Sequence, residues 1–126
     1  MSAESTAREF IRSFNERDLD AFEKTLDPEI ELHSRKGLVK GISAARKWAT
    51  RKSGGVQQTV VITEVEAVGP KVLVRIRRDW HWEEDGSLAA SDDMAWFFMV
   101  RDDRVLSWRP FADTAEAFAA FNKPEK

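Results

Sequence analysis

The sequence contains no cysteine and only two histidines in 126 residues. It therefore cannot form a disulfide or use a thiolate as a nucleophile or metal ligand, and two histidines are too few for a histidine-rich zinc site. The scattered acids show no metal-ligand spacing, and no glycine-rich phosphate loop is present. We therefore expect no metal and no cofactor. The lack of cysteine also suits a reducing compartment, so we expect a cytoplasmic protein.

The sequence also lacks a strong excess of charge and a long apolar run. Its 22 acidic and 20 basic side chains give a net charge of -2, without the clustered positive charge that neutralises nucleic-acid phosphates. No segment approaches the ~20 continuous apolar residues of a membrane-spanning helix, and the start of the chain has no secretory signal. Nucleic acid and membrane are therefore not expected partners.

The length and composition indicate one compact domain. With 42% apolar and 33% charged residues, the chain has enough hydrophobic side chains for a core that encloses a small pocket. We place a single domain over residues 1–122 and a polar tail over residues 123–126.

Helical periodicity is found near both ends of this domain. Apolar residues spaced three and four apart predict a first helix. They are Ala3, Ala7, Phe10, Ile11 and Phe14. A second helix is predicted between a cap at Asp18 and the Asp27-Pro28 pair, a third from a cap at Ser43 to Gly54-Gly55, and a last one over 114–121, capped by Asp113.

Strand periodicity fills the rest of the chain. Glu29 to His33 is predicted as a short strand, and Gly37 and Gly41 as part of a loop. Four longer strands are predicted over 56–68, 71–84, 88–100 and 104–111, joined by turns at Gly69-Pro70, Asp85-Gly86 and Asp102-Asp103. Helices followed by hairpin-connected strands predict an α+β fold, with helices on one face of a strongly curved antiparallel sheet. The open end of such a cone is a natural apolar pocket.

Alternation along residues 71–84 predicts which side chains enter the cone, because successive residues of a strand point to opposite faces. The more apolar set is expected inside: Val72, Val74, Ile76, Arg78, Trp80 and Trp82. The other set is expected outside: Leu73, Arg75, Arg77, Asp79 and His81. A permanently charged arginine inside needs a partner. Asp92, Asp93 and an anionic ligand, carboxylated or phenolic, remain alternatives for Arg78 at this point.

Five tryptophans are the least ordinary feature of the composition. Aromatic walls suit a flat ligand, although each ring can instead fill the core or a dimer interface. Trp108 shares its predicted face with Leu106 and Pro110, whereas the side of Trp96 stays open. The candidate ligand-binding residues are Phe14, Trp48, Arg78, Trp80, Trp82 and Trp108.

Three segments carry a resemblance to a known family: the opening helix, LDPEIELHSRKGLVKG and MAWFFMVRDDRVLSWRPFADTAEAFAAF. Together they resemble the SnoaL-like branch of the nuclear transport factor 2 (NTF2) superfamily, which includes polyketide cyclases, ketosteroid isomerase and limonene-type epoxide hydrolase. The resemblance implies a cone-shaped NTF2-like fold and a homodimer. Fold does not determine function, so the chemistry has to be judged from individual residues.

The catalytic residues of these relatives transfer poorly to this chain. Where the resemblance places an acid-base carboxylate on the last strand, the sequence has Trp108-Arg109-Pro110, and proline cannot move a proton. The sequence also has no tyrosine for an isomerase-type oxyanion hole. An epoxide-hydrolase-like Arg77-x-Asp79 spacing falls on the outer face. The remaining catalytic candidates are His33 and Asp92, and a dehydratase-like pair would require His33 and His81 to converge.

Three functions are compatible with these residues. The first is binding of a small hydrophobic or aromatic molecule in the cone pocket, with an anionic group if Arg78 is its partner. The alternative is a cofactor-independent isomerase, cyclase or hydratase, a lyase-type reaction included, that uses acid-base chemistry. The third is a protein-interaction module that docks at the pocket mouth.

Overall fold

The computed structural model describes residues 3–34, 37–50 and 56–122. The elements follow in this order: α1 (Ala3–Glu16), α2 (Leu19–Lys24), β1 (Leu26–Ser34), β2 (Gly37–Lys40), α3 (Ile42–Ala49), β3 (Val56–Val68), β4 (Lys71–Trp82), β5 (Leu88–Arg101), β6 (Arg104–Phe111) and α4 (Thr114–Asn122). The predicted polar tail over 123–126 and the helix end at Gly54-Gly55 lie outside the described residues.

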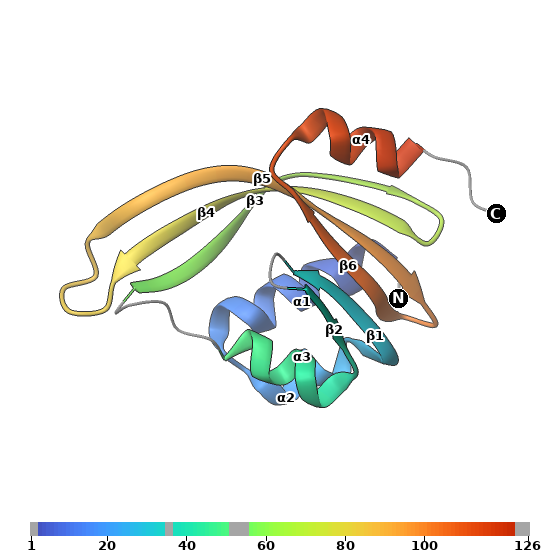
Figure 1. The fold of residues 1–126 in the computed structure, drawn as a ribbon, viewed down its shortest axis with the longest axis horizontal. Helices are drawn as coiled ribbons and strands as arrows, with labels where there is room; N and C mark the ends of the chain where they lie inside the picture. Colours follow the sequence, from blue (N-terminus) through green and yellow to red (C-terminus); the bar gives the residue numbers. More distant parts are fainter. Residues whose placement is uncertain (1–2, 35–36, 51–55, 123–126) are drawn as a thin grey trace.

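One open, strongly curved sheet organises the molecule. Its strand order is β2-β1-β6-β5-β4-β3, and β3, β4 and β5 arch over α1, α2 and α3 (Figure 1). The predicted α+β class is confirmed, but the sheet is mixed, because β1 pairs with β6 in parallel. Hairpin signals report only strands that are neighbours in sequence, so they gave no indication of this long-range pair.

The concave face carries the larger hydrophobic core. Phe10 of α1 is fully buried there, with ring centroids 4.8 Å from Phe22 and 5.1 Å from Phe98. Val72, Val74 and Ile76 belong to the same buried cluster. The predicted inner face of β4 is therefore correct. Trp96, whose side the sequence left open, is buried in this core as well.

The convex face carries a second, smaller core beneath α4. Leu73, Ala95, Ala117 and Phe121 are buried in it, and Phe97, Phe111 and Phe118 pack against it. The prediction that all helices lie on one face of the sheet is therefore wrong, because α4 covers the convex face and the other helices cover the concave face (Figure 1). Leu73 and the other apolar side chains on the outer face are the reason, because that part of the sheet also buries hydrophobic surface.

A β-bulge changes the face of Leu106, which alternation along the last strand placed on the same side as Trp108. β5 and β6 pair through Met99 with Ser107 and through Val100 with Val105, which leaves Leu106 as the extra residue. Val105 and Trp108 are both buried on the concave side, while Leu106 lines a groove together with Ser107 and Arg109. The expectation that Leu106 shares the face of Trp108 is wrong, because a bulge breaks the two-residue period.

Two of the three predicted helix caps are present in the structure. Asp18 and Asp113 accept hydrogen bonds from the backbone N–H groups of Ala21 and Ala115 at 3.2 and 2.8 Å, as expected of caps. Ser43 does not cap α3, because Gly41 occupies the N-cap with φ of 89°. This glycine conformation lets the chain turn directly from β2 into the helix.

Several element boundaries also differ from the predictions. α2 ends at Lys24 and β1 begins at Leu26, so Asp27 and Pro28 lie in a strand and do not end the helix. Residues 37–40, expected in a loop, pair with β1 as β2. β4 ends at Trp82, two residues before the predicted end at Glu84.

Asp27 ties the start of β1 to the end of β5. Its largely buried carboxylate accepts bonds from Arg101 Nη2 and Nε at 3.0 and 3.2 Å and from the Glu29 N–H at 2.8 Å. These bonds, that of Arg101 foremost, lower the pKa of Asp27. A lowered folded-state pKa contributes stability above the unfolded-state pKa of about 3.9, and that stability is lost as pH falls through the folded-state value.

We therefore predict that Asp27→Asn lowers the free energy of unfolding by roughly 1 to 2 kcal/mol at pH 7 and by less at pH 3, where the unfolded-state carboxyl is largely protonated. Urea unfolding of both proteins at the two pH values measures this difference. Glu29→Gln, at the more exposed partner of Arg101, is the control and should change little. An equal cost of Asp27→Asn at pH 7 and pH 3 would contradict the prediction.

Candidate functional site

A small cavity lies on the concave side of the sheet, between α1, α3 and the ends of β3 and β4. Its volume is about 150 Å³. It is lined by Phe14, Arg17, Trp48, Ala49, Val56, Gln58 and Trp80. Phe14, Trp48 and Trp80 were predicted as ligand-binding residues, and the structure brings these three together at one cavity.

Aromatic rings form a continuous layer beside this cavity. The centroid of Trp48 lies 5.5 Å from that of Phe14 and 4.8 Å from that of Trp108, and Trp96 lies 5.1 Å from Trp108 at a nearly perpendicular angle of 81°. Such tilted and edge-to-face contacts fix each ring against its neighbours. Trp96 and Trp108 therefore pack against the cavity residues Phe14 and Trp48 on the side away from the cavity.

Trp108 supports this wall without lining the cavity. It is buried against Trp48 and Trp96, and its Nε1 has no hydrogen-bond partner among the described residues. It pairs with Leu32 of β1 across the parallel ladder. The sequence placed Trp108 correctly on the inner face, but the structure puts it one layer behind the cavity.

Arg17 is a cavity residue that the sequence analysis missed. It follows α1 in the left-handed region, with φ of 57°, and its guanidinium carbon lies 5.1 Å from the centroid of Phe14. Its Nη1 donates to the Phe14 and Ala49 carbonyls at 3.4 Å, and its Nη2 to the Gln58 carbonyl at 3.3 Å. Burial lowers the pKa of Arg17. Gln58, the other missed polar residue of the wall, reaches the cavity from β3.

Arg78 lies on the predicted concave face, with its side chain 20% exposed. The structure gives it a protein partner: Nε donates to Asp92 Oδ1 at 2.8 Å, and Nη2 donates to Oδ2. Its guanidinium carbon is 5.4 Å from the centroid of Trp80. Arg78 is therefore held beside a cavity residue by Asp92, and it does not line the cavity itself.

Trp82, another predicted ligand-binding residue, lies farther along β4 and is 48% exposed. Its backbone closes the following turn, through an N–H bond to the Ser87 carbonyl at 2.9 Å and a carbonyl that accepts from Gly86 at 2.8 Å. Its side chain does not line the cavity. The structure separates it from Phe14, Trp48 and Trp80.

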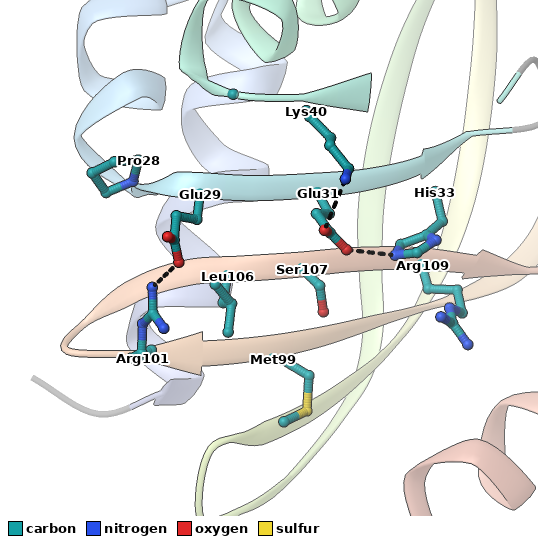
Figure 2. Close-up of a pocket in the computed structure, with 11 residues that line it drawn as sticks. Pro28, Glu29, Glu31, His33, Lys40, Met99, Arg101, Leu106, Ser107 and Arg109 are labelled. Carbon is teal, nitrogen blue, oxygen red and sulfur yellow. Dashed lines mark hydrogen bonds and ion pairs between the residues drawn. The ribbon is translucent and has the colours of Figure 1, made fainter. Parts of the chain in front are cut away.

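His33, the first catalytic candidate, lies on the opposite face of the sheet. It lines a groove together with Glu31, Lys40, Ser107 and Arg109 (Figure 2). The volume of this groove is about 820 Å³. The Nε2 atom of His33 is 3.7 Å from Glu31 Oε1. Burial, followed by the charge of Arg109, lowers the pKa of His33, against the opposing effect of Glu31. We therefore expect a neutral imidazole at pH 7.

Strand geometry keeps the two catalytic candidates apart. Leu32, next to His33, is buried in the concave core, so His33 points to the convex side. Asp92 pairs with Arg78 on the concave side. A molecule bound in the cavity cannot contact both residues at once.

His33 and His81 do not converge either. β1 and β4 are separated by β6 and β5 in the sheet, and His81 pairs with Leu88 beside the hairpin turn. On the same face as His81, Arg77 donates to both carboxylate oxygens of Asp79 at 3.0 and 3.1 Å. The Arg-x-Asp spacing is thus an ion pair on the convex face, and the structure forms no histidine pair.

The chemistry of the cavity lining favours binding over proton transfer. Its polar side-chain groups are one guanidinium, one carboxamide and two indole N–H groups, and none of these is a proton shuttle near neutral pH. Within residues 3–34, 37–50 and 56–122, no three side chains of His, Asp or Glu gather closely enough to hold a metal ion. Among the described residues, no helix combines the length and apolar character that crossing a lipid bilayer requires.

Comparison with known proteins agrees with this architecture. A family model described as SnoaL-like domain matches residues 7–108, which confirms the resemblance found in the sequence. No curated protein sequence matches this chain closely enough to count as a relative.

Solved structures share the fold at low sequence identity. A protein of Xanthomonas campestris pv. campestris provisionally described as a polyketide cyclase has a TM-score of 0.75 at 19% identity, covering 93% of this chain and 94% of its own. TerC, co-crystallized with polyporic acid, has a TM-score of 0.74 at 16% identity, covering 94% and 96%. An uncharacterized cystatin fold protein of Novosphingobium aromaticivorans has a TM-score of 0.72 at 21% identity, covering 88% and 98%.

Proposed function

Because this chain belongs to the SnoaL-like domain family, we propose that it binds a small hydrophobic or aromatic molecule in the concave cavity. The observation that carries this proposal is the cavity itself, walled by Phe14, Trp48 and Trp80. Its volume of about 150 Å³ matches that of apolar cavities that take up one benzene ring. The ligand, or the part of it that enters, is therefore a single ring.

The shared fold supports a pocket of this kind. TerC, a structural neighbour of this chain, was co-crystallized with polyporic acid. Small-molecule sites in proteins are generally concave and mostly apolar, with a few polar groups that orient the ligand. Arg17 and Gln58 supply those polar groups here.

Acid-base catalysis is less well supported by the same residues. Asp92 is engaged by Arg78, His33 faces the convex side, and the last strand has Pro110 where the resemblance places a carboxylate. The residues that line the cavity include no histidine, aspartate or glutamate that could exchange a proton with a bound ligand near neutral pH. The protein-interaction role, the homodimer and the cytoplasmic location stay predictions.

Titration of the protein with benzyl alcohol, a neutral single-ring probe, tests the proposal. Because Trp48 and Trp80 line the cavity, we expect a saturable change in tryptophan fluorescence, with a Kd between about 10 µM and 1 mM for a ligand of this size. A fused two-ring probe, 2-naphthalenemethanol, is the matched comparison and should bind more weakly. The proposal would be ruled out if calorimetry showed no saturable binding of benzyl alcohol or of its analogues benzoate and benzamide.

A further inference from the structure

We infer that the guanidinium of Arg17 is the anion-binding group of the concave cavity, and that the ligand is a single-ring aromatic carboxylate. This inference rests on the proposed function and adds the chemical class of the ligand. The sequence analysis named Arg78 as the possible partner of an anionic ligand. Arg17 replaces Arg78 in this role.

The distribution of ion pairs distinguishes Arg17 from the other described arginines. Seven of them have a carboxylate within 4.0 Å: Arg8, Arg12, Arg46, Arg75, Arg77, Arg78 and Arg101. Within the described ranges, Arg17, Arg104 and Arg109 form no ion pair, and of these three only Arg17 is partly buried. It is therefore the one described arginine that is partly buried and has no carboxylate partner among the described residues.

The hydrogen bonds of Arg17 leave part of its guanidinium unused. A guanidinium has five N–H groups in a planar fork, and the carbonyls of Phe14, Ala49 and Gln58 take at most three of them. The Nε–H and one Nη2–H have no partner in the described part of the chain. Arg77 and Arg78 hold Asp79 and Asp92 through this same pair of nitrogens.

Neutral carbonyls compensate a buried positive charge only in part, which is why burial lowers the pKa of Arg17. Arginine does not lose its proton in proteins, so the charge persists in the cavity wall. A bound carboxylate would supply the missing counter-charge through a bidentate, charge-assisted contact. The site thus favours an anion over a neutral ligand of the same shape.

The neighbouring side chains define the rest of the ligand. Arg17 lies over the Phe14 ring at 5.1 Å, and Trp48 and Trp80 complete the wall of a cavity that holds one ring. An acid group attached directly to that ring would reach Arg17 while the ring contacts the aromatic wall. Arg78 competes poorly for the same group, because Asp92 already accepts from its Nε and Nη2 and neutralises its charge.

Calorimetric titration at pH 7 with benzoate and with benzamide tests the inference, because the two probes have nearly the same shape and differ in charge. In the wild-type protein we expect benzoate to bind at least tenfold more tightly than benzamide. Arg17→Gln should remove this preference, because benzoate is expected to lose at least fivefold more affinity than benzamide does. Arg104→Gln makes the same change of charge at an exposed arginine without an ion pair among the described residues, and should keep the full preference.

The stability of Arg17→Gln has to be checked by thermal unfolding, because Arg17 bridges three backbone carbonyls. If this variant does not fold, Arg17→Lys replaces it: the charge stays but the planar fork is lost, and we expect the preference for benzoate to fall at least threefold. The wild-type comparison needs no variant.

Two outcomes would overturn the inference and leave the proposed function in place. These are equal affinity of the wild-type protein for the two probes, and a preference for benzoate that survives in the folded Arg17 variant. Failure of benzoate, benzamide and benzyl alcohol alike to bind would instead remove the proposed function, and this inference with it.

Discussion

Phe10→Ala is expected to lower the free energy of unfolding by about 3 to 5 kcal/mol. Phe10 is fully buried where α1 meets both α2 and the sheet, with Phe22, Phe98 and Trp96 around it at centroid distances of 4.8, 5.1 and 6.4 Å. Loss of the ring removes its transfer free energy and leaves a cavity that these packed rings cannot close. Urea unfolding followed by circular dichroism measures the loss.

The matched control is Phe118→Ala in α4. Phe118 is only partly buried at the edge of the smaller convex core, so the same chemical change should cost less than half as much. A cost of Phe10→Ala below about 1 kcal/mol, or one no larger than that of Phe118→Ala, would show that α1 does not pack on the sheet as described.

Gln58→Trp is expected to weaken benzoate and benzyl alcohol binding at least tenfold while the protein stays folded. Gln58 lines the cavity from β3, and an indole ring at this position would occupy the space that the ligand needs. Arg17 bonds to the backbone carbonyl of Gln58, so the substitution leaves that contact in place. Aromatic residues are also well tolerated in strands. Calorimetric titration measures the affinity, and thermal unfolding verifies the fold.

Gln57→Trp is the control for this experiment, because it adds the same ring to the adjacent residue. Gln57 is exposed and points to the opposite face of β3, so ligand affinity should remain within twofold of that of the wild type. If Gln58→Trp binds the probes as well as the wild type does, the ligand lies somewhere other than the concave cavity.

The site shows how far sequence reasoning extends. Alternation placed Arg78 and Trp80 on the inner face of β4, and helical periodicity placed Phe14 on the inner face of α1, because a strand or helix repeats its side-chain directions regularly. The same reasoning could not assign a partner to Arg78, because Asp92 faces it only through the register of β4 with β5. Trp82 failed to reach the cavity because it lies beyond the part of β4 that the helices cover.

Arg17 and His33 mark the limit of this reasoning. Nothing in the sequence distinguishes Arg17 from the other arginines, since its environment is built from carbonyls of Phe14, Ala49 and Gln58 in three separate segments. His33 attracted attention by its residue type, but the pairing of Leu32 with Trp108 turned it to the convex side. Residue type indicates which chemistry a side chain can perform, whereas its surroundings decide whether it does.

The sequence by itself determined the α+β class, the family resemblance, the caps at Asp18 and Asp113 and the inner face of β4, because these follow from local periodicity and from motifs along the chain. Only the tertiary structure decided the parallel pairing of β1 with β6, the position of α4 on the convex face and the bulge at Leu106. It also decided which cation lacks a counter-ion in the cavity wall. These features depend on contacts between residues far apart in sequence, where packing and pairing outweigh local preference.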